Sequence, residues 1–228
     1  SLEMSKDQLV ERMFCSMMGL DSWKLRNGKL TDQELSNIGI VMQDLNNISM
    51  YIDDAPECSI IDLRTKARRL QQEHGLDLLV IDYLQLMGSS SPTRDNNQVQ
   101  KISEISRSLK LLARELQVPI IALSQLSRTV ESRPEKIPQL SDLRDSGSIE
   151  QDADIVLFIY RDDYYNPDSA RPGTADIIIA KHRAGPTGRV ELGYKKEQIL
   201  FVNMDRTHEQ PGQFAPPQSQ PQSHSNYH

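Results

Sequence analysis

Residues 78–87, Leu-Leu-Val-Ile-Asp-Tyr-Leu-Gln-Leu-Met, constrain the fold of this chain more than any other stretch. A solid apolar run of this kind is typical of a strand buried on both faces of a parallel sheet. It delivers one carboxylate, Asp82, to the carboxyl end of the strand, where open α/β sheets bind ligands. In nucleotide hydrolases an acid at this position holds the Mg²⁺ of a bound triphosphate, directly or through water. An acid that only caps the strand is the alternative interpretation.

Predicted helices alternate with predicted strands along the rest of the chain. Helical spacing of apolar residues predicts helices at residues 6–18, 32–45, 59–74 and 97–116. Apolar runs predict further strands at residues 118–124, 154–160, 176–180 and 199–203. This alternation indicates an α/β fold with a doubly wound, mostly parallel sheet, and the close spacing of the last strands indicates antiparallel edge strands.

Composition divides the chain into a domain and a tail. Residues 207–228 are rich in Pro, Gln and Ser and have almost no apolar residues to bury, which predicts a disordered tail. A segment that docks a partner is the alternative. Residues 1–206 are long enough for one sizeable α/β domain. The net charge of −6 does not favour bulk capture of nucleic acid, although a ring or channel needs only a local basic lining.

A phosphate-binding loop of the form Gly-x-x-x-x-Gly-Lys-Ser/Thr is absent from the sequence, although a Mg²⁺–nucleotide site at Asp82 requires one. The single Gly-Lys pair, Gly28-Lys29, is followed by Leu30 and does not follow a predicted strand. Either the loop lies on preceding sequence outside this chain, or the protein is not a phosphate-loop enzyme. Residues 1–5 read like the end of a strand that enters a helix, which favours a domain truncated at its amino end.

Five motifs occur in a fixed order: Ser-Leu-Glu-Met-Ser (1–5), Leu-Val-Ile-Asp-Tyr-Leu-Gln-Leu-Met (79–87), Ile-Ala-Leu-Ser-Gln-Leu-Ser-Arg (121–128), Leu-Arg-Asp-Ser-Gly-Ser-Ile-Glu-Gln-Asp-Ala-Asp (143–154) and Lys-His-Arg-Ala-Gly-Pro-Thr-Gly (181–188). Together they resemble the C-terminal motor domain of the DnaB-type bacterial replicative helicases, from Ser1 to about Asp205. The resemblance implies a RecA-like fold, ATP and Mg²⁺ as cofactors, single-stranded DNA as substrate and a homo-hexameric ring. Primase and a helicase loader are the implied partners, through regions that this chain lacks.

The resemblance implies roles for three residues near the first strands. Glu3 matches the catalytic glutamate that polarises the attacking water, and Asp82 matches the Mg²⁺-associated acid. Gln125 matches a residue that senses the γ-phosphate and relays that state to the DNA-contacting loops. Without the resemblance, Glu3 is equally well an acid at a helix start, and Gln125 a residue that bonds its own loop.

Lys181 and Arg183 follow the predicted strand 176–180 and precede a Gly-Pro-Thr-Gly turn. Two cations two positions apart on an extended backbone project to the same side. The resemblance implies that they reach the ATP site of the neighbouring subunit as an arginine finger and its companion. A finger supplied in trans requires a head-to-tail interface, which can close into a ring. Solvated cations at a strand end are the alternative, and His182 is assigned no chemistry.

The resemblance also implies a grip on single-stranded DNA. Arg144 is expected to pair with a phosphate, while the backbone N–H groups of Asp145 and Gly147 are expected to donate to phosphate oxygens. Arg94 lies in a Ser-rich polar segment that is a candidate second pore loop, with an ordinary exposed loop as the alternative.

Three hypotheses of function follow from these motifs. The first is a fragment of a cytoplasmic, nucleoid-associated or organellar replicative helicase, which couples ATP hydrolysis at subunit interfaces to translocation and unwinding and is inactive as this chain alone. The second is a non-catalytic DNA-binding or oligomerisation fragment that binds no ATP without a complementary amino-terminal piece. The third is a different RecA-type ATPase, which the DNA loop and the Lys-x-Arg turn argue against.

Overall fold

The computed structural model describes residues 1–88 and 98–204, apart from the side chains of residues 144–146. The predicted tail at residues 207–228 and the loop residue Arg94 lie outside this part of the chain. The division of the chain near residue 206 therefore stays a prediction. Within the described residues, four helices precede the first strand, and helices and strands alternate only from there to β4 (Thr174–His182).

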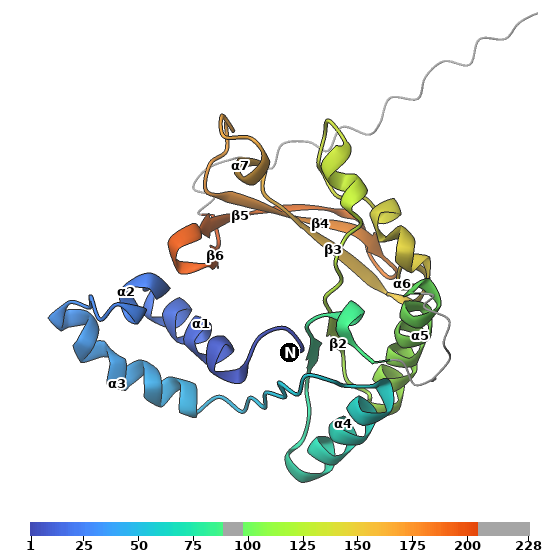
Figure 1. Cartoon of the computed structure of the whole chain (residues 1–228), viewed down its shortest axis with the longest axis horizontal. Coiled ribbons are helices and arrows are strands. Elements are labelled where there is room, and N and C mark those ends of the chain that lie inside the picture. The colour runs from blue at the N-terminus through green and yellow to red at the C-terminus, as the bar shows by residue number, and fades with distance from the viewer. Residues whose placement is uncertain (89–97, 205–228) are drawn as a thin grey trace, which may run out of the picture.

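Three helices of the first third of the chain, α1 (Lys6–Met18), α3 (Asp32–Asn46) and α4 (Ile60–His74), begin at a capping box. At α4, for example, the Ser59 hydroxyl accepts from the Asp62 N–H and the Asp62 carboxylate accepts from the Ser59 N–H. These reciprocal bonds satisfy backbone donors that the first helical turn leaves free, so the start of each helix is fixed locally. The short α2 (Ser22–Arg26) joins α1 to α3, which lie side by side (Figure 1).

The parallel strands form a two-stranded sheet of their own, β1 (Leu79–Ile81) and β2 (Ile120–Ala122), paired from Leu79↔Ile120 to Ile81↔Ala122. The crossover between them contains α5 (Gln98–Leu116). One core cluster packs α4 and α5 against β1. Its members are Ile60 of α4, Ile81 of β1, Ile105 and Leu109 of α5, and Leu84 and Met87 after β1. Leu84 belongs to the 3-10 helix η1 (Leu84–Leu86). The turn that follows Asp82 is therefore held on a buried base.

The antiparallel part contains four strands in the order β3-β4-β5-β6. They are β3 (Ile155–Tyr160), β4 (Thr174–His182), β5 (Gly188–Lys195) and β6 (Leu200–Val202). Shorter elements connect them to β2 and to each other: η2 (Arg128–Ser132), η3 (Leu140–Ser146), α6 (Gly147–Asp152), α7 (Asp162–Tyr165) and η4 (Lys196–Gln198). Figure 1 shows β3, β4 and β5 extending from the side of α6 towards β6.

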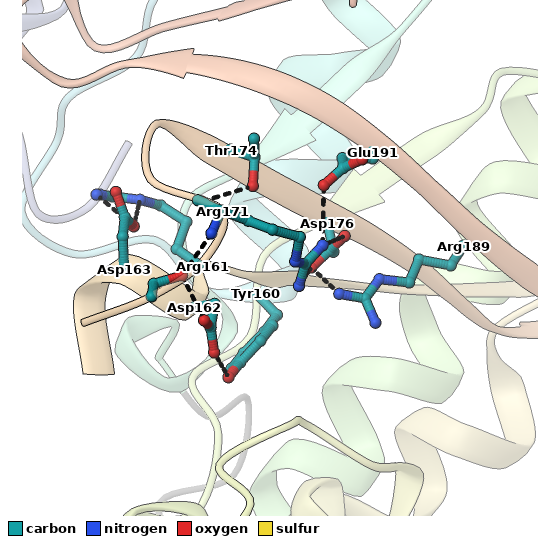
Figure 2. A network of polar contacts seen from close by, with 10 residues as sticks. Tyr160, Arg161, Asp162, Asp163, Arg171, Thr174, Asp176, Arg189 and Glu191 are labelled. Carbon is teal, nitrogen blue, oxygen red and sulfur yellow. Dashed lines mark hydrogen bonds and ion pairs between the residues drawn. The ribbon is translucent and has the colours of Figure 1, made fainter. Parts of the chain in front are cut away.

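A buried carboxylate ties β4 to β5 and to the loop before β4 (Figure 2). Asp176 of β4 is 1% exposed. Both of its oxygens accept from Arg171, at 3.2 and 3.1 Å, and one also accepts from Arg189 of β5. Burial raises the pKa of the Asp176 carboxyl, but the two guanidinium groups outweigh it and hold the pKa below its ordinary value. The pair of arginines therefore fixes the position of β4 relative to β5.

One set of apolar strand residues is not covered. In β3, Val156, Phe158 and Tyr160 are buried, whereas the alternate residues Ile155, Leu157 and Ile159 are 50%, 56% and 60% exposed. Val80 of β1 and Ile121 of β2 are also exposed. Residues that alternate along a strand lie on opposite faces, so β3 presents an apolar row to solvent. The strand before Asp82, expected to be buried on both faces, is covered on one face only, because Ile81 is buried and Val80 is 52% exposed.

The fold class expected from the sequence, α/β with parallel and antiparallel strands, is confirmed. In the described residues two strands form a parallel sheet and four form a separate antiparallel sheet, so the antiparallel strands outnumber the parallel ones. Residues 1–5 form no strand, contrary to expectation. A strand needs a ladder of main-chain hydrogen bonds to an adjacent strand. Residues 1–5 make one such bond to the segment that follows β1, from the Leu2 N–H to the Asp82 carbonyl oxygen. None of the described helices has the length and apolar character needed to cross a membrane.

Candidate nucleotide and nucleic-acid site

Glu3 and Asp82 are brought to the same place by the main chain. Asp82 directly follows β1 and is half-buried, and its carbonyl oxygen accepts from the Leu2 N–H at 2.8 Å. Glu3, which follows Leu2, is exposed, and α1 begins three residues later behind its cap Ser5. The amino terminus therefore lies beside the parallel strands (Figure 1). Two acidic residues that are 79 positions apart in sequence lie at the carboxyl end of β1.

Gln125 lies three residues beyond β2 on the same edge, because β1 and β2 are parallel and end at the paired residues Ile81 and Ala122. Its N–H donates to the Gln85 side chain at 3.2 Å, and its carbonyl oxygen accepts from that side chain at 3.2 Å. The Gln125 side chain is exposed and makes no hydrogen bond to the described residues. Glu3, Asp82 and Gln125 therefore line one edge of the parallel pair.

Lys181 is held by its own subunit. Its ammonium group donates to the carbonyl oxygens of Glu150 at 2.5 Å and Gln151 at 3.4 Å, near the end of α6. These are carbonyl groups of the last turn of a helix, which lack partners within the helix and carry its partial negative charge. Lys181 is half-buried as a result, not a free cation at the strand end.

Arg183 is the more open of the two cations. Its side chain is 68% exposed and its Nη1 donates to the Asp154 carboxylate at 3.3 Å. Lys110 of α5 binds the other oxygen of Asp154, and the hydrogen bond from Lys110, followed by that from Arg183, holds the pKa of Asp154 below its ordinary value. Both Lys181 and Arg183 thus contact residues 150–154 of their own subunit.

His182 has a local role in the turn. Its ring nitrogen Nδ1 lies 3.4 Å from the Pro186 carbonyl oxygen, and a Cβ added to Gly185 would come within 2.4 Å of the ring. Gly185 is therefore required for the ring to pack against the turn.

The segment expected to grip DNA is η3 followed directly by α6, so Arg144 and Asp145 lie in the last turn of η3 and Gly147 begins α6. The side chains of Arg144 and Asp145 lie outside the described atoms. Gly147 is exposed with φ −53°, and a Cβ there would meet no atom within 4 Å. The base of the segment is anchored by buried Asp142, which accepts from Arg133 and from the Gln139 N–H.

Among the described residues no hydrogen bond or ion pair joins Lys181 or Arg183 to Glu3, Asp82 or Gln125. Nor do those residues include a group of three or more His, Cys, Asp or Glu side chains that would hold a metal. Asp82 as a single carboxylate nevertheless fits Mg²⁺, which proteins bind through one or two carboxylates together with phosphate oxygens and water.

Sequence reasoning gave no role to Gln85 or to Asp154. Both lie inside motifs that were identified, and each carries a polar side chain close to the end or the start of an apolar strand. Their partners are 40 and 29 residues away, so spacing along the chain does not reveal them.

Candidate residues at the carboxyl ends of two parallel strands are typical of ligand-binding α/β domains. The solved structures described below show that the fold is that of a RecA-like ATPase domain. A family model described as "DnaB-like helicase C terminal domain" matches residues 1–203, and the chain belongs to that family. One solved structure, an isolated ATPase domain by its title, superposes with a TM-score of 0.85 at 39% identity, over 90% of this chain and 73% of that one. A DnaB-like replicative helicase, whose title names its interactions with primase, gives a TM-score of 0.85 at 39% identity, over 90% of this chain and 50% of that one.

Two sequence relatives support the assignment. The replicative DNA helicase DnaB of Geobacillus stearothermophilus is 56% identical over 206 residues, which are 90% of this chain and 45% of the relative. The replicative DNA helicase DnaC of Bacillus subtilis (strain 168) is 51% identical over 212 residues, which are 93% of this chain and 46% of the relative. The chain therefore spans about half the length of these curated relatives.

Proposed function

We propose that this chain is the motor part of a replicative DNA helicase that hydrolyses ATP at subunit boundaries and moves along single-stranded DNA. The observation that carries the proposal is the convergence of Glu3, Asp82 and Gln125 at one edge of the parallel pair, from three separate segments. The similarity to replicative helicases of two organisms supports it. A cytoplasmic location on chromosomal DNA follows from this activity.

In the proposed mechanism, the residues of one subunit supply the hydrolytic half of the site. The Glu3 carboxylate orients a water and accepts its proton as the water attacks. Asp82 is the residue that would hold Mg²⁺, and the ion would neutralise charge on the phosphates. Gln125 places its free side-chain amide towards the γ-phosphate. The sequence contains no phosphate-binding loop. In this proposal a segment of the complete protein other than residues 1–228 holds the triphosphate.

The neighbouring subunit supplies the cationic half. Arg183 is the residue suited to act as the finger, because it is mostly exposed and its pairing with Asp154 is that of a surface ion pair. A guanidinium group at the transferred phosphoryl group stabilises the charge that develops there. Lys181 acts as its companion. Since the finger acts in trans, the subunits must associate head to tail, and a hexameric ring is the assembly that we propose.

DNA contact is assigned to the segment between η3 and α6. Backbone N–H groups at Asp145 and Gly147 donate to phosphate oxygens, Arg144 pairs with a phosphate, and Arg94 contributes from a second loop. Gly147 supports this assignment, since its conformation is open to any residue and its surroundings are empty, so packing within the chain does not require glycine. Primase and a loader are proposed partners of the complete protein.

A second function is favoured by one observation, the absence of a phosphate-binding loop. On this view the chain binds DNA and associates with complete subunits, but it binds no ATP without a complementary amino-terminal piece. This is a binding module and not an enzyme.

Mixing the chain with an amino-terminal piece separates the two functions. The piece is the part of the Geobacillus stearothermophilus relative that precedes the matched region, expressed separately. The helicase proposal expects ATP hydrolysis that neither piece shows alone, stimulated by oligothymidylate and abolished by Glu3→Gln. ATP hydrolysis that stays absent, together with retained oligothymidylate binding, would support the module.

A further inference from the structure

Hydrogen bonds continue between two chain segments beyond the ends of β1 and β2. The Leu123 N–H donates to the Ile81 carbonyl oxygen at 2.9 Å, and the Leu84 N–H donates to the Leu123 carbonyl oxygen at 3.0 Å. The next contact along these segments is made by a side chain, that of Gln85. The two segments therefore stay in register past the point at which the strands end.

The Gln85 side-chain amide takes the place of a peptide group in this ladder. Its Oε1 accepts from the Gln125 N–H at 3.2 Å, while its Nε2 donates to the Gln125 carbonyl oxygen at 3.2 Å and to the Ser124 hydroxyl at 3.0 Å. A primary amide carries a donor and an acceptor side by side, as a strand residue does. Both polar groups of the Gln125 main chain are satisfied by one side chain. The orientation of the amide is fixed, because the reverse orientation would oppose two donors.

Gln85 projects from a rigid base. It lies in η1, three residues after Asp82, and its neighbours Leu84 and Met87 are 2% and 1% exposed within the core cluster. Gln125, by contrast, lies in an exposed segment, where its main chain is held by Gln85 and its side chain is free of hydrogen bonds to the described residues. This combination of a fixed main chain and a free side chain suits a residue that must reach a ligand from a defined point.

We infer that Gln85 is a positioning residue, which holds the main chain of Gln125 at a fixed place relative to Asp82. The inference rests on the function proposed above. Gln85 does not touch the nucleotide; it acts through Gln125, so that the Gln125 amide meets the γ-phosphate at the edge where Asp82 holds Mg²⁺. Glutamine is the residue that fits, because methionine of similar length has no donor and only a weak sulfur acceptor, and glutamate retains only the acceptors.

The test uses a full-length chimera in which residues 1–204 replace the matching part of the Geobacillus stearothermophilus relative. Gln85→Met is expected to lower the DNA-stimulated kcat for ATP hydrolysis about tenfold, with KM for ATP changed by less than about twofold, since the lost bonds orient a group and do not bind substrate. Gln85→Glu, which keeps the size and one type of bond, is expected to give an intermediate loss and provides a second variant if methionine impairs folding.

Gln71 offers a matched control. Its Nε2 donates to the Leu116 carbonyl oxygen at 2.8 Å and joins α4 to the end of α5, away from the site. Gln71→Met removes a bond of the same kind and is expected to lower thermal stability to a similar extent while leaving kcat unchanged. Equal kcat losses in the Gln85 and Gln71 variants would overturn the inference and assign Gln85 a purely structural role.

A double-mutant cycle with Gln125→Ala tests whether Gln85 acts through Gln125. When Gln125 is already alanine, Gln85→Met should lower kcat by less than about twofold further, because the group that it positions is gone. Effects that multiply in the double variant would overturn the inference while leaving the proposed function intact. A parent chimera that is folded, binds oligothymidylate and hydrolyses no ATP contradicts the proposed function itself, and the inference falls with it.

Discussion

Arg183 is bound to Asp154 through both its main chain and its side chain. The Arg183 N–H donates to the Asp154 carbonyl oxygen at 2.8 Å, and its Nη1 donates to the Asp154 carboxylate at 3.3 Å. The main-chain bond fixes where the residue starts, whereas the exposed ion pair is weak and can exchange for a phosphate. Asp154 thus keeps Arg183 at the surface of its own subunit without burying it.

Replacing Arg183 separates its role in catalysis from any role in folding. Arg183→Ala should change the free energy of unfolding by less than about 1 kcal/mol, because its side chain is exposed. In the chimera it should reduce ATP hydrolysis by about a thousandfold or more, the range found for arginine fingers. Arg64→Ala is the control, since Arg64 is an exposed arginine paired with Glu115 at 2.6 Å. The rate of ATP hydrolysis of this variant should match that of the parent chimera. Equal activity of both variants would contradict a finger at Arg183.

The buried carboxylate of β4 predicts a pH-dependent stability. Asp176→Asn should destabilise the fold by about 3 kcal/mol, the lower end of the range for breaking a buried pair, because Arg171 and Arg189 are partly solvated. The pKa of Asp176 is lowered in the folded state, so its contribution is fully present above the ordinary carboxyl pKa and is lost as pH falls through the folded pKa. Urea unfolding of the chimera across acidic pH measures both effects.

Glu191→Gln is the matched control for Asp176→Asn. Glu191 accepts from the same Arg171 at 2.9 Å but is partly exposed, so its loss should cost less than about 1 kcal/mol. A difference in stability between parent and Asp176→Asn that stays constant as pH falls would contradict the assignment, as would equal costs for the two substitutions.

Replacing Gly147 by alanine should weaken DNA binding without lowering the stability of the fold. Its φ of −53° suits any residue and a Cβ would meet no atom within 4 Å, so Gly147→Ala should leave the fold unchanged or stabilise it by about 0.4–1 kcal/mol. If a phosphate approaches the main chain here, the added methyl group should weaken oligothymidylate binding about tenfold. Fluorescence anisotropy of a labelled oligothymidylate measures this. Gly39→Ala in α3 is the control, because a Cβ there also meets no atom within 4 Å, and it should leave oligothymidylate binding unchanged. Equal affinities of the Gly147→Ala and Gly39→Ala variants for oligothymidylate would argue against a phosphate contact at Gly147.

The sequence predicts what short-range chemistry determines. The helices at residues 6–18 and 59–74 begin and end close to where the pattern placed them, because Ser5, Ser59 and Gly75 act within one turn. Strand β5 was not predicted, although Val190, Leu192 and Tyr194 alternate with polar residues as in a half-buried strand. The expected strands were placed on continuous apolar runs, which residues 188–195 lack.

The same distinction holds at the candidate site. Asp82 and Gln125 each follow an apolar strand that the sequence pattern predicts, so only the parallel pairing of β1 with β2 was needed to place them at one edge. The hydrogen bonds from Lys181 to the α6 carbonyl groups join residues that are far apart in sequence, with separations of 31 and 30 positions. Spacing along the chain does not reveal such contacts. Extended-strand geometry placed Lys181 and Arg183 on one side, but it did not predict that one would be engaged and the other open.

The exposed apolar row of β3 indicates that this chain, purified by itself, is prone to aggregate. Ile155, Leu157 and Ile159 are at least half exposed, and we propose that the amino-terminal piece packs against them. Without that piece the chain should aggregate or lack a cooperative unfolding transition, since exposed apolar strands pair with other chains. Light scattering and thermal melting of the purified chain measure this. A cooperative melt of a monomer would contradict it.

Ile159→Ser tests the occupant of that row directly. In the chain alone it should raise the monomeric fraction, because it removes apolar surface from the 60%-exposed position. In the mixture with the amino-terminal piece it should weaken association by about 2 kcal/mol, because burial of an isoleucine side chain is lost, and it should lower the restored ATP hydrolysis accordingly. Leu111→Ser on α5, which is 59% exposed and lies outside this sheet, is the control and should not affect association. If both substitutions weaken association equally, the amino-terminal piece does not cover β3, and the exposed row must be covered by another part of the assembly.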